Sequence, residues 1–514
     1  MFFVWQNQDQ PLFGYPHDDG IYYSSAKSLA DGAGYKIASY PGQPYQTKYP
    51  PGLPAYLALA WKMNPEFPSN LTQAAWLQFL WMPALLALSL WHWRDWGLAE
   101  WQRWTLAAVL ATNTYVLYFT VTLLSELPFT VTMLLCLMLV RKAESASRRA
   151  LALMAFAGLI GGVVFLMRTA GVVLLIGVPA VMLWRKRNAL AGVFALAMAP
   201  VVVSWAVWSF SNRLPGNDHL TLYYTNYVGI HLKVFHFNEA HLFLWKNIDG
   251  FLASVGGLIF PSILPGQFGR ILSQVIGVAA IAGAVRLVRT RLITHFAVFS
   301  VLASLLILAW SYPPTERFVL PMSALIWAGF LTEVCHLASG IRAKLHDKDM
   351  GQRVAAFGIA AAGICLIAYG SYLQAKLRFE TMPAMAANER LRLAQDSEAY
   401  GWMRANLPKD AALLSGYDAL AYLYTGRSAA TLMPPVNFVY HDDPAGREEY
   451  MARAGANSRE AGLNYVYMSR HDFRNDLDDE AKEKLMKRIE SSGDLELLQS
   501  FAAGKVFRVK QRVN

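Results

Sequence analysis

The sequence predicts a polytopic α-helical membrane protein that ends in a soluble α/β domain. Of its 514 residues, 55% are hydrophobic and only 16% are charged, whereas ordinary soluble proteins carry roughly 25% charged residues. Several apolar stretches approach the roughly 20 residues that a helix needs to cross a bilayer. From Gln374 onward the composition turns polar. A soluble single-domain enzyme is therefore not expected.

Ten apolar stretches are the candidate membrane spans, and this even number places both termini on one side of the membrane. Two of them, 127–140 and 171–184, are short for a full crossing and are compatible with tilted or half-buried helices. The ten stretches are 71–93, 104–122, 127–140, 150–166, 171–184, 189–210, 271–287, 292–310, 319–336 and 354–372.

The basic residues set the predicted orientation. The 46 Lys and Arg exceed the 36 Asp and Glu, giving a formal charge of +10, but no basic-aromatic pattern of a nucleic-acid-binding element accompanies this excess. The basic residues gather instead in alternate short connections, which the positive-inside rule places in the cytoplasm. These connections are 94–103, 141–149, 185–187, 286–291 and 342–353.

Both termini then lie outside, and the chain divides into three parts. Residues 1–70 form a first external loop, residues 71–373 form the transmembrane domain with an external loop at 211–270, and residues 374–514 form an extracytoplasmic α/β domain. Because loops hold binding and catalytic residues while spans form the scaffold, chemistry or recognition is expected on the external face.

The first external loop contains two expected helices. In 21–30, Ile21, Tyr22 and Leu29 fall on one face and Lys27 on the other, which is typical of an amphipathic helix lying on the membrane surface. Residues 53–61 are apolar but too few to span, which indicates a re-entrant or interfacial helix. The Tyr49-Pro50-Pro51-Gly52 stretch between them requires an extended turn.

The external loop 211–270 carries four histidines among aromatic residues. Their irregular spacing lacks the i, i+4 repeat of metal ligands on one helix. We therefore interpret them as interfacial or acceptor-groove residues, with a metal site as the less favoured alternative. They are His219, His231, His236 and His241.

Residues 374–514 alternate helical patterns with short apolar runs, which predicts a small α/β sandwich. Their sequence contains no Gly-rich phosphate loop, His-Glu-x-x-His motif or nucleophile elbow. The helical patterns cover 388–405, 418–424, 447–454 and 479–490, and the apolar runs cover 412–414, 465–468, 495–499 and 506–509.

Asp18 and Asp19 are adjacent acids just before the first external helix. An aspartate in this position commonly caps a helix, because its carboxylate accepts a hydrogen bond from a free backbone N–H. Alternatively, one carboxylate acts as a general base on an acceptor hydroxyl or amine while the other orients it or holds a cation. The spacing alone does not decide between these roles.

Two further ionisable residues lie at the external ends of spans. Glu126 follows Ser125 and precedes Pro128. An ionisable residue at this depth is costly and usually functional, although one at a helix end is also able to face the aqueous interface. Arg168 lies between two spans, where a snorkelling anchor is an equally good interpretation.

Two more cations, Lys48 and Arg317, belong to the same predicted face. Lys48 immediately precedes Tyr49-Pro50-Pro51, and Arg317 follows a similar Tyr-Pro-Pro stretch at 312–314. Arg offers a planar fork for phosphate oxygens and Lys a point charge, so both suit the phosphate of a lipid head group. Each alone is more often a surface charge, but their occurrence with external acids favours a common site.

Five short motifs follow one another on the external face. They are Asp18-Asp19-Gly20-Ile21-Tyr22, Lys48-Tyr49-Pro50-Pro51-Gly52-Leu53-Pro54, Leu124-Ser125-Glu126, Met167-Arg168-Thr169-Ala170-Gly171 and Glu316-Arg317-Phe318-Val319-Leu320-Pro321. In this order they resemble the GT-C glycosyltransferases of the protein-mannosyltransferase and aminoarabinose-transferase type (glycosyltransferase family 39). The resemblance covers the membrane part and implies a GT-C-like fold with about 10–12 transmembrane helices.

The resemblance also implies roles for individual residues. The family's Asp-Glu pair falls on Asp18 and Asp19, which makes Asp18 the expected base and Asp19 its neighbour, and Glu126 matches the acid at the start of a later span. The family places a transmembrane helix before this acidic loop, where the present sequence has only the apolar residues 1–5. The expected donor-phosphate-binding residues are Lys48, Arg168 and Arg317.

The implied function is transfer of a sugar from a polyprenyl-phosphate-linked donor to a lipid, glycan or protein acceptor, with inversion, at the external face of the inner (plasma) membrane. Nucleic acid is not an expected partner. A divalent cation, Mg²⁺ or Mn²⁺, is left open, with Asp18, Asp19 and His17 as candidate ligands. The alternatives are a lipid or sugar transporter and a non-catalytic membrane ligand-binding protein. Acids and bases that cluster at one face, rather than mid-span, favour the enzyme.

Overall fold

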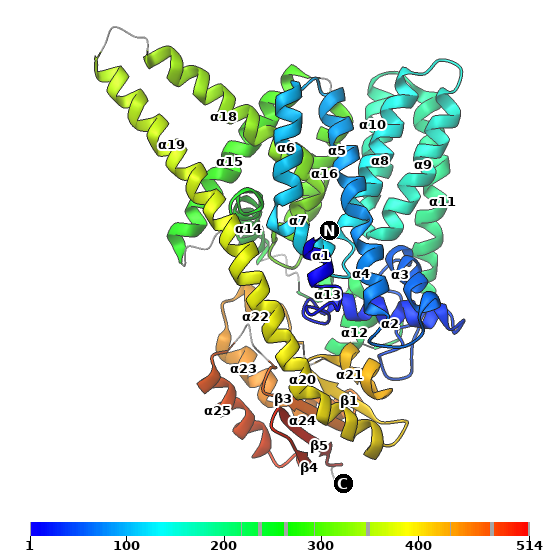
Figure 1. Cartoon of the computed structure of the whole chain (residues 1–514). Helices are drawn as coiled ribbons and strands as arrows, with labels where there is room; N and C mark the ends of the chain where they lie inside the picture. The colour runs from blue at the N-terminus through cyan, green and yellow to red at the C-terminus, as the bar shows by residue number, and fades with distance from the viewer. Residues whose placement is uncertain are drawn as a thin grey trace.

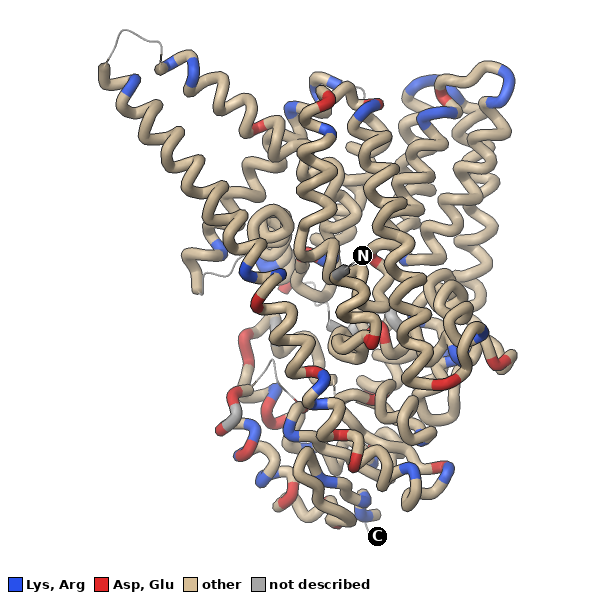
Figure 2. The backbone as a smooth tube through the Cα atoms, viewed as in Figure 1, with Lys and Arg blue, Asp and Glu red and all other residues tan. Residues whose placement is uncertain are grey.

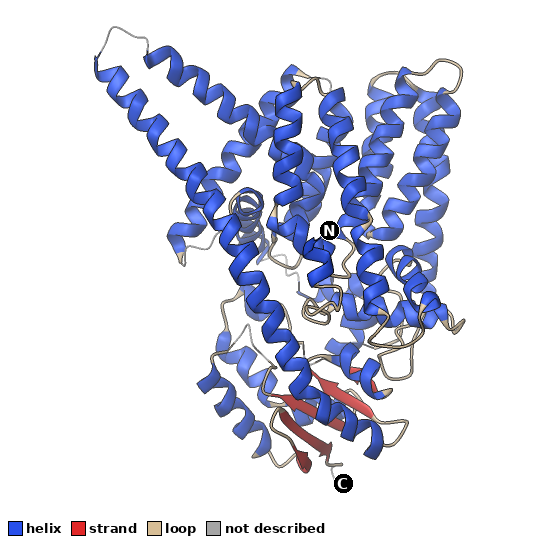
Figure 3. Cartoon of the chain, in the orientation of Figure 1, coloured by secondary structure: helices blue, strands red, loops and turns tan. Residues whose placement is uncertain are grey.

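The computed structural model describes residues 2–216, 218–234, 239–261, 266–291, 293–345, 350–431, 433–472 and 477–511. It consists of a helical membrane bundle and a C-terminal α/β domain that projects from one end of the bundle (Figure 1, Figure 3). Within the described residues, seven helices are long and apolar enough to cross a membrane. The predicted fold class, a multi-pass α-helical membrane protein with a C-terminal α/β domain, is confirmed.

Each of the ten predicted spans is helical, but two are interrupted. The first is divided at Leu80, and the second ends its long helix at Thr112. The side chain of Asn113 then caps the following short helix by accepting a hydrogen bond from the backbone N–H of Val116 at 3.1 Å. The bundle comprises α4 (Leu71–Phe79), α5 (Trp81–Asp95), α6 (Glu100–Thr112), α7 (Thr114–Thr120), α8 (Glu126–Ser145), α9 (Ala150–Met167), η1 (Thr169–Val172), α10 (Val173–Trp184), α11 (Asn188–Asn212), α15 (Gln267–Thr290), α16 (Thr294–Leu308), α17 (Glu316–Val319), η3 (Leu320–Met322), α18 (Ser323–Leu345) and α19 (Met350–Lys376).

Lys and Arg gather in the turns at the end of the bundle opposite the α/β domain (Figure 2). One of them, Arg185, pairs with Glu144, and a histidine of another turn contacts the same carboxylate. The carboxylate of Glu144 lies 2.5 Å from Arg185 Nη1 and 3.0 Å from His295 Nε2. These contacts join three turns at that end. This is the end at which the sequence predicts the cytoplasmic connections.

The predicted external loop 211–270 is not simply a loop, because it contains the helices α12 (His219–Thr225), α13 (Tyr227–Val234) and α14 (Ala240–Ile259). α14 is long and apolar enough to span, yet Figure 1 shows it nearly end-on while the spans run up the page, so it lies across the bundle. Lys246 and Asp249 interrupt its apolar pattern, which hides it from a search for uninterrupted spans. His236 lies outside the described residues, and His219, His231 and His241 belong to no cluster that could hold a metal among those described.

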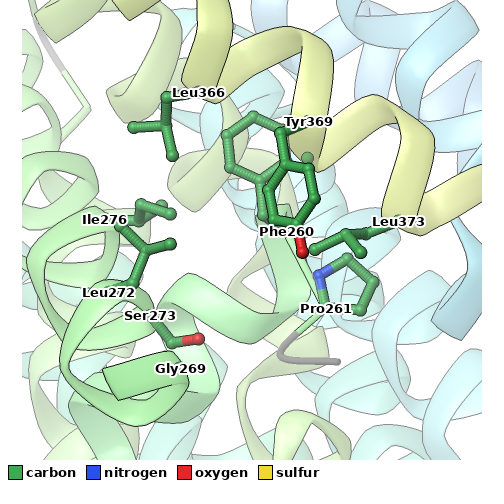
Figure 4. Close-up of a pocket in the computed structure, with 10 residues that line it drawn as sticks. Phe260, Pro261, Gly269, Leu272, Ser273, Ile276, Leu366, Tyr369 and Leu373 are labelled. Carbon is green, nitrogen blue, oxygen red and sulfur yellow. The ribbon is translucent and has the colours of Figure 1, made fainter. Parts of the chain in front are cut away.

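α19 diverges from the bundle at its start and returns to it near its end (Figure 1). Phe260, just after α14, packs on Gly370 of α19 so closely that a Cβ at that position would lie 2.1 Å from the phenylalanine ring. Beside this contact, side chains of α19 and α15 line a gap of about 20 Å³ (Figure 4), which is room for roughly one water molecule. The end of α19 is therefore fixed against α14 and α15.

The chain passes the predicted boundary at 373/374 inside a continuous helical segment. A π-helical turn, η4 (Leu377–Thr381), and α20 (Met382–Asn406) follow α19 directly. The remaining elements are β1 (Ala412–Ser415), α21 (Asp418–Thr425), β2 (Ser428–Ala430), α22 (Asn437–Tyr440), α23 (Pro444–Ala452), α24 (Ala454–Glu460), β3 (Tyr465–Ser469), α25 (Asp479–Glu490), β4 (Leu495–Ser500) and β5 (Gly504–Val509).

The α/β domain contains one mixed five-stranded sheet with strand order β2-β1-β3-β5-β4. β1 is parallel to β2 and β3, whereas β5 is antiparallel to β3 and β4. The four predicted strands are all present. β2 is additional, and its three residues are too few to stand out in the sequence. In the view of Figure 1, α20 crosses in front of the sheet and α21 lies between the sheet and the bundle.

The N-terminal piece consists of α1 (Phe2–Gln6), α2 (Asp18–Ala30) and α3 (Gly52–Met63). The two predicted helices are present, but α2 is buried on its polar face as well as on its apolar face. Ser24 and Ser28, which lie outside the predicted apolar face, are buried together with Ile21. The loop that follows α2 covers them and bonds to them, for example from Ser28 Oγ to the Gly34 carbonyl at 2.8 Å. α2 is thus an interior helix that holds its first turn in place.

Candidate functional site

A cavity of about 270 Å³ lies where the N-terminal piece meets the ends of the spans nearest the α/β domain. Four of the six predicted site residues line it, namely Asp18, Lys48, Arg168 and Arg317. An acid and three cations from four separate segments therefore face one cavity. The apolar part of its wall is formed by Met167, Ala170, Val172, Leu306, Ile307, Trp310 and Phe318.

The predicted turn at residues 49–52 places Lys48 near Arg168. Gly52 begins α3 so close to the end of α9 that a Cβ there would lie 2.6 Å from the carbonyl oxygen of Leu166. Only glycine permits such an approach. Two residues after Leu166, Arg168 leaves the helix with an extended backbone, at φ −151° and ψ 136°. The local sequence Arg-Thr-Ala-Gly then forms the start of η1, so the guanidinium projects at the helix junction.

Arg317 connects the two acids of the site. Its Nη2 lies 2.7 Å from Asp18 Oδ2, and its Nε donates to Glu126 Oε1. Arg168 Nη1 donates to the same Glu126 oxygen and, at 3.2 Å, to Ser125 Oγ. Glu126 is completely buried at the start of α8. It therefore lies behind the cavity wall, where it pairs with both guanidinium groups. These two ion pairs explain why a charged residue is found at this depth.

Asp18 is held in its ionised form. Tyr49 OH donates to Asp18 Oδ1 at 2.5 Å. Burial alone would raise the pKa of Asp18, but Arg317, Lys48 and the Tyr49 hydrogen bond together hold that pKa well below its ordinary value, because each favours the charged form. Lys48 is 4% exposed, and its Nζ lies 3.6 Å from the centroid of the Tyr223 ring.

Asp19 points away from the cavity, unlike the prediction that pairs it with Asp18. Its Oδ2 accepts from the backbone N–H of Gly14 at 3.1 Å and its Oδ1 from that of Gly20 at 2.8 Å. Burial raises the pKa of Asp19 to about 7. Neither aspartate is the helix cap, because that position is occupied by His17 and both acids lie in the first turn. The geometry of Asp19 fits a structural role in the loop before α2.

The three candidate metal ligands face different partners. Asp18 is paired with Arg317, Asp19 accepts from backbone amides, and His17 Nε2 lies 3.0 Å from Asp418 Oδ1. In the described parts of the chain, no group of three or more His, Cys, Asp or Glu could hold a metal ion. The donor atoms therefore do not fit a shared divalent cation.

Asp418, at the start of α21 in the α/β domain, carries no sequence signal but reaches the site. It is 1% exposed, accepts from Tyr224 OH at 2.6 Å and faces His17 at 3.0 Å. Burial would lower the pKa of His17, but Asp418 raises it above its ordinary value. The contact is close, since a Cβ on Gly20 would lie 2.6 Å from the Ala419 Cβ. The α/β domain thus fixes the backbone that carries Asp18.

This contact gives a testable expectation for whatever reaction the cavity supports. We expect Asp418→Asn to slow turnover by about 10-fold, less than the roughly 10²-fold loss that a displacement of about 1 Å causes in a catalytic group. The pH profile should also shift, because the pKa of His17 falls when its counter-charge is removed. The matched control is Asp410→Asn, an exposed aspartate of the same domain. Equal rates and equal pH profiles in both variants would show that Asp418 does not position the site.

Solved structures are similar over almost the whole chain. ArnT from Cupriavidus metallidurans bound to undecaprenyl phosphate aligns with a TM-score of 0.50 at 12% identity, covering 96% of this chain and 93% of that chain. An oligosaccharyltransferase from Archaeoglobus fulgidus, tethered with an acceptor peptide, aligns with a TM-score of 0.49 at 12% identity, covering 96% of this chain and 70% of that chain. No family model and no curated protein matches the sequence. The likeness to ArnT shows the fold, which is the GT-C fold that the motifs imply.

Proposed function

We propose that this chain is a membrane glycosyltransferase that transfers a sugar, with inversion, from a polyprenyl-phosphate-linked donor to an acceptor. The observation that carries the proposal is the cavity in which Asp18 faces Lys48, Arg168 and Arg317 against an apolar wall. The fold shared with ArnT, whose structure contains undecaprenyl phosphate, supports this class of donor.

The three cations suit the donor's phosphate. The guanidinium groups of Arg168 and Arg317 offer planar pairs of N–H donors for phosphate oxygens, and Lys48 adds a point charge. Glu126 holds both guanidinium groups from behind, so they need little reorganisation when the bond to the sugar breaks and negative charge grows on the phosphate. The apolar wall, including Trp310, suits the first isoprene units of the lipid.

Asp18 is the proposed general base. The acceptor's hydroxyl or amine attacks the anomeric carbon, its proton passes to the Asp18 carboxylate, and the bond to the phosphate oxygen breaks to release polyprenyl phosphate. Attack opposite the phosphate inverts the anomeric configuration. The bound donor phosphate also interacts with the positive charges of Arg317 and Lys48, so these residues stabilise the Asp18 carboxylate less. The pKa of Asp18 therefore rises when the donor is bound and a base is needed.

We place the site on the extracytoplasmic face of the inner (plasma) membrane. This is supported by its position at the end of the bundle that carries the α/β domain, opposite the turns rich in Lys and Arg (Figure 2). A lipid, glycan or protein acceptor then approaches from the same side as the α/β domain.

Lys48 predicts a specific dependence on pH. Burial lowers the pKa of Lys48 to about 8, so the free enzyme loses this positive charge as the pH rises through that value. We expect kcat/KM for the donor to fall above about pH 8, while kcat changes less because the bound phosphate keeps Lys48 charged. In Lys48→Arg this fall in kcat/KM should occur at higher pH. Lys48→Gln should raise KM for the donor more than KM for the acceptor. If kcat/KM for the donor falls at the same pH in Lys48→Arg as in the wild type, Lys48 does not bind the donor phosphate.

We propose further that transfer needs no divalent cation. The reason is the divergence of the candidate ligands Asp18, Asp19 and His17, together with the guanidinium of Arg317 already placed between Asp18 and Glu126. Activity should persist after treatment with EDTA and show no stimulation by Mg²⁺ or Mn²⁺. Activity that disappears on chelation and returns with one of these ions would refute this part of the proposal.

A further inference from the structure

A second and larger cavity, of about 310 Å³, lies in the bundle away from Asp18. It is bounded by α6, α18 and α19 and is closed at one end by Asn113, between α6 and α7, and by Ile259 and Phe260 at the end of α14. Gly257 of α14 contacts Glu316, the neighbour of Arg317, whereas Ile259 lines the second cavity. The two cavities therefore lie on different sides of the end of α14. The lining residues used below are Leu106, Val109, Trp327, Phe330, Gln374 and Arg378.

The second cavity has an apolar body and a polar end. Leu106, Val109 and Phe330 belong to the body, whereas Gln374 near the end of α19 and Arg378 in η4 form the polar end, nearest the α/β domain. The amide of Gln374 is already used, since its Nε2 donates to the Ile259 carbonyl at 3.1 Å and its Oε1 accepts from Thr114 Oγ1 at 2.6 Å. Gln374 therefore shapes the polar end rather than supplying a free ligand.

Two N–H groups of the lining are shielded and unused. Trp327 is 7% exposed, and neither its Nε1 nor Arg378 Nε has a hydrogen-bond partner among the described residues. Shielded donors normally find a partner, because an unmade hydrogen bond is costly. An oxygen atom of a bound molecule could accept a hydrogen bond from each donor. The Arg378 donor is positively charged, so it favours a negatively charged acceptor.

The local backbone at Arg378 is unusual as well. Arg378 lies in η4, the π-helical turn between α19 and α20. Single π-helical turns within α-helices are rare and frequently occur at functional sites. The guanidinium of Arg378 stacks on its neighbour Phe379, with Cζ 4.7 Å from the ring centroid.

Two residues of α19 that line the second cavity are exposed on the outside of the bundle. Ile367 is 42% exposed, and Ser371 one turn later is also exposed. An occupant can therefore enter sideways from the membrane. The volume of the second cavity, about 310 Å³, is at the low end of the range of roughly 300–1,000 Å³ that is typical of ligand sites.

We propose that this second cavity binds a phosphate-bearing membrane lipid. The head-group phosphate accepts from Arg378, an ester or hydroxyl oxygen below it accepts from Trp327, and one chain lies against Leu106, Val109 and Phe330. This combination satisfies the charge, both unused donors and the apolar wall with one molecule. The site is separate from the Asp18 cavity and does not depend on the proposed glycosyl transfer.

The test uses the full-length purified protein and phosphatidylglycerol as the probe. Native mass spectrometry at increasing lipid concentration should show one tightly retained phosphatidylglycerol in the wild type. Arg378→Gln should weaken its retention at least roughly tenfold, as expected for a charge-assisted hydrogen bond, and Val109→Phe should weaken it by filling the cavity. The matched control is Arg213→Gln, since Arg213 stacks on Phe210 in the same way, with Cζ 4.2 Å from the ring, but lies outside the cavity.

Each outcome of this test supports or overturns the proposal. Equal weakening in Arg378→Gln and Arg213→Gln would overturn it, because general charge would then explain retention. Displacement of the lipid by excess inorganic phosphate would also overturn it, because the apolar body would contribute nothing. If Val109→Phe does not fold, quenching by phosphatidylglycerol with brominated chains is measured as the difference between wild type and Trp327→Phe. Quenching that is specific to Trp327 supports the site, and its absence overturns it.

Discussion

Asp18→Asn is expected to slow sugar transfer by about 10²–10⁴-fold, the range that a general base contributes. The asparagine keeps the shape of the side chain and still accepts the hydrogen bond from Tyr49, but it cannot take up the acceptor's proton. The measurement is the single-turnover rate with a polyprenyl-phosphate-linked donor, alongside the affinity for that donor. The rate should collapse while donor affinity changes little.

The adjacent aspartate supplies the matched control for this experiment. Asp19→Asn is the same chemical change one residue further along, but Asp19 faces the amides of Gly14 and Gly20 rather than the cavity. We expect it to lower thermal stability and to retain most of the rate. A larger loss of rate in Asp19→Asn than in Asp18→Asn would exchange the assigned roles.

Arg317→Gln is expected to lower kcat/KM for the donor by about 10²–10³-fold, as removal of a group that stabilises developing charge does. Arg317 is in contact with both Asp18 and Glu126, so its loss removes the proposed partner of the donor phosphate and the bridge between the acids. The control is Arg270→Gln, because Arg270 also pairs with an aspartate, Asp249, but is exposed and outside the cavity. Comparable losses in both variants would argue against a role in the site.

The pH profile of Arg317→Gln separates a chemical effect from a structural one. Arg317 is the strongest of the charges that hold the pKa of Asp18 down against burial. Without it the pKa rises, and because only ionised Asp18 acts as a base, residual activity should be lost at a higher pH on the acid side than in the wild type. An unchanged acid limb would mean that Asp18 is not the titrating base.

Much of the architecture follows from local sequence, because hydrophobic length and period are local properties. The ten apolar stretches became helices, and the strand at 465–468 was found almost to its ends. α14, which lies across the bundle, was not predicted because Lys246 and Asp249 interrupt its apolar pattern. β2 was missed because three residues give no period.

The site is only partly readable from the sequence, for a different reason. Lys48, Arg168 and Arg317 could be assigned together because the sequence predicts all three on the same external face. The orientation of Asp19 could not be predicted, because it depends on the fold of the loop that supplies the Gly14 amide. The contact of Asp418 with His17 could not be predicted either, because it depends on the α/β domain packing on α2. The loop that follows α2 buries the face of this helix that was predicted to be polar. Contacts between segments 400 residues apart leave no periodic trace in either one.

The most direct test of the central claim is transfer from a panel of radiolabelled polyprenyl-phosphate sugars by the purified protein, with wild type and Asp18→Asn compared side by side. The expected result is transfer of one sugar by the wild type and its loss in the variant. No turnover with any donor, or equal turnover in the two proteins, would contradict the assignment and favour a transporter or a ligand-binding protein.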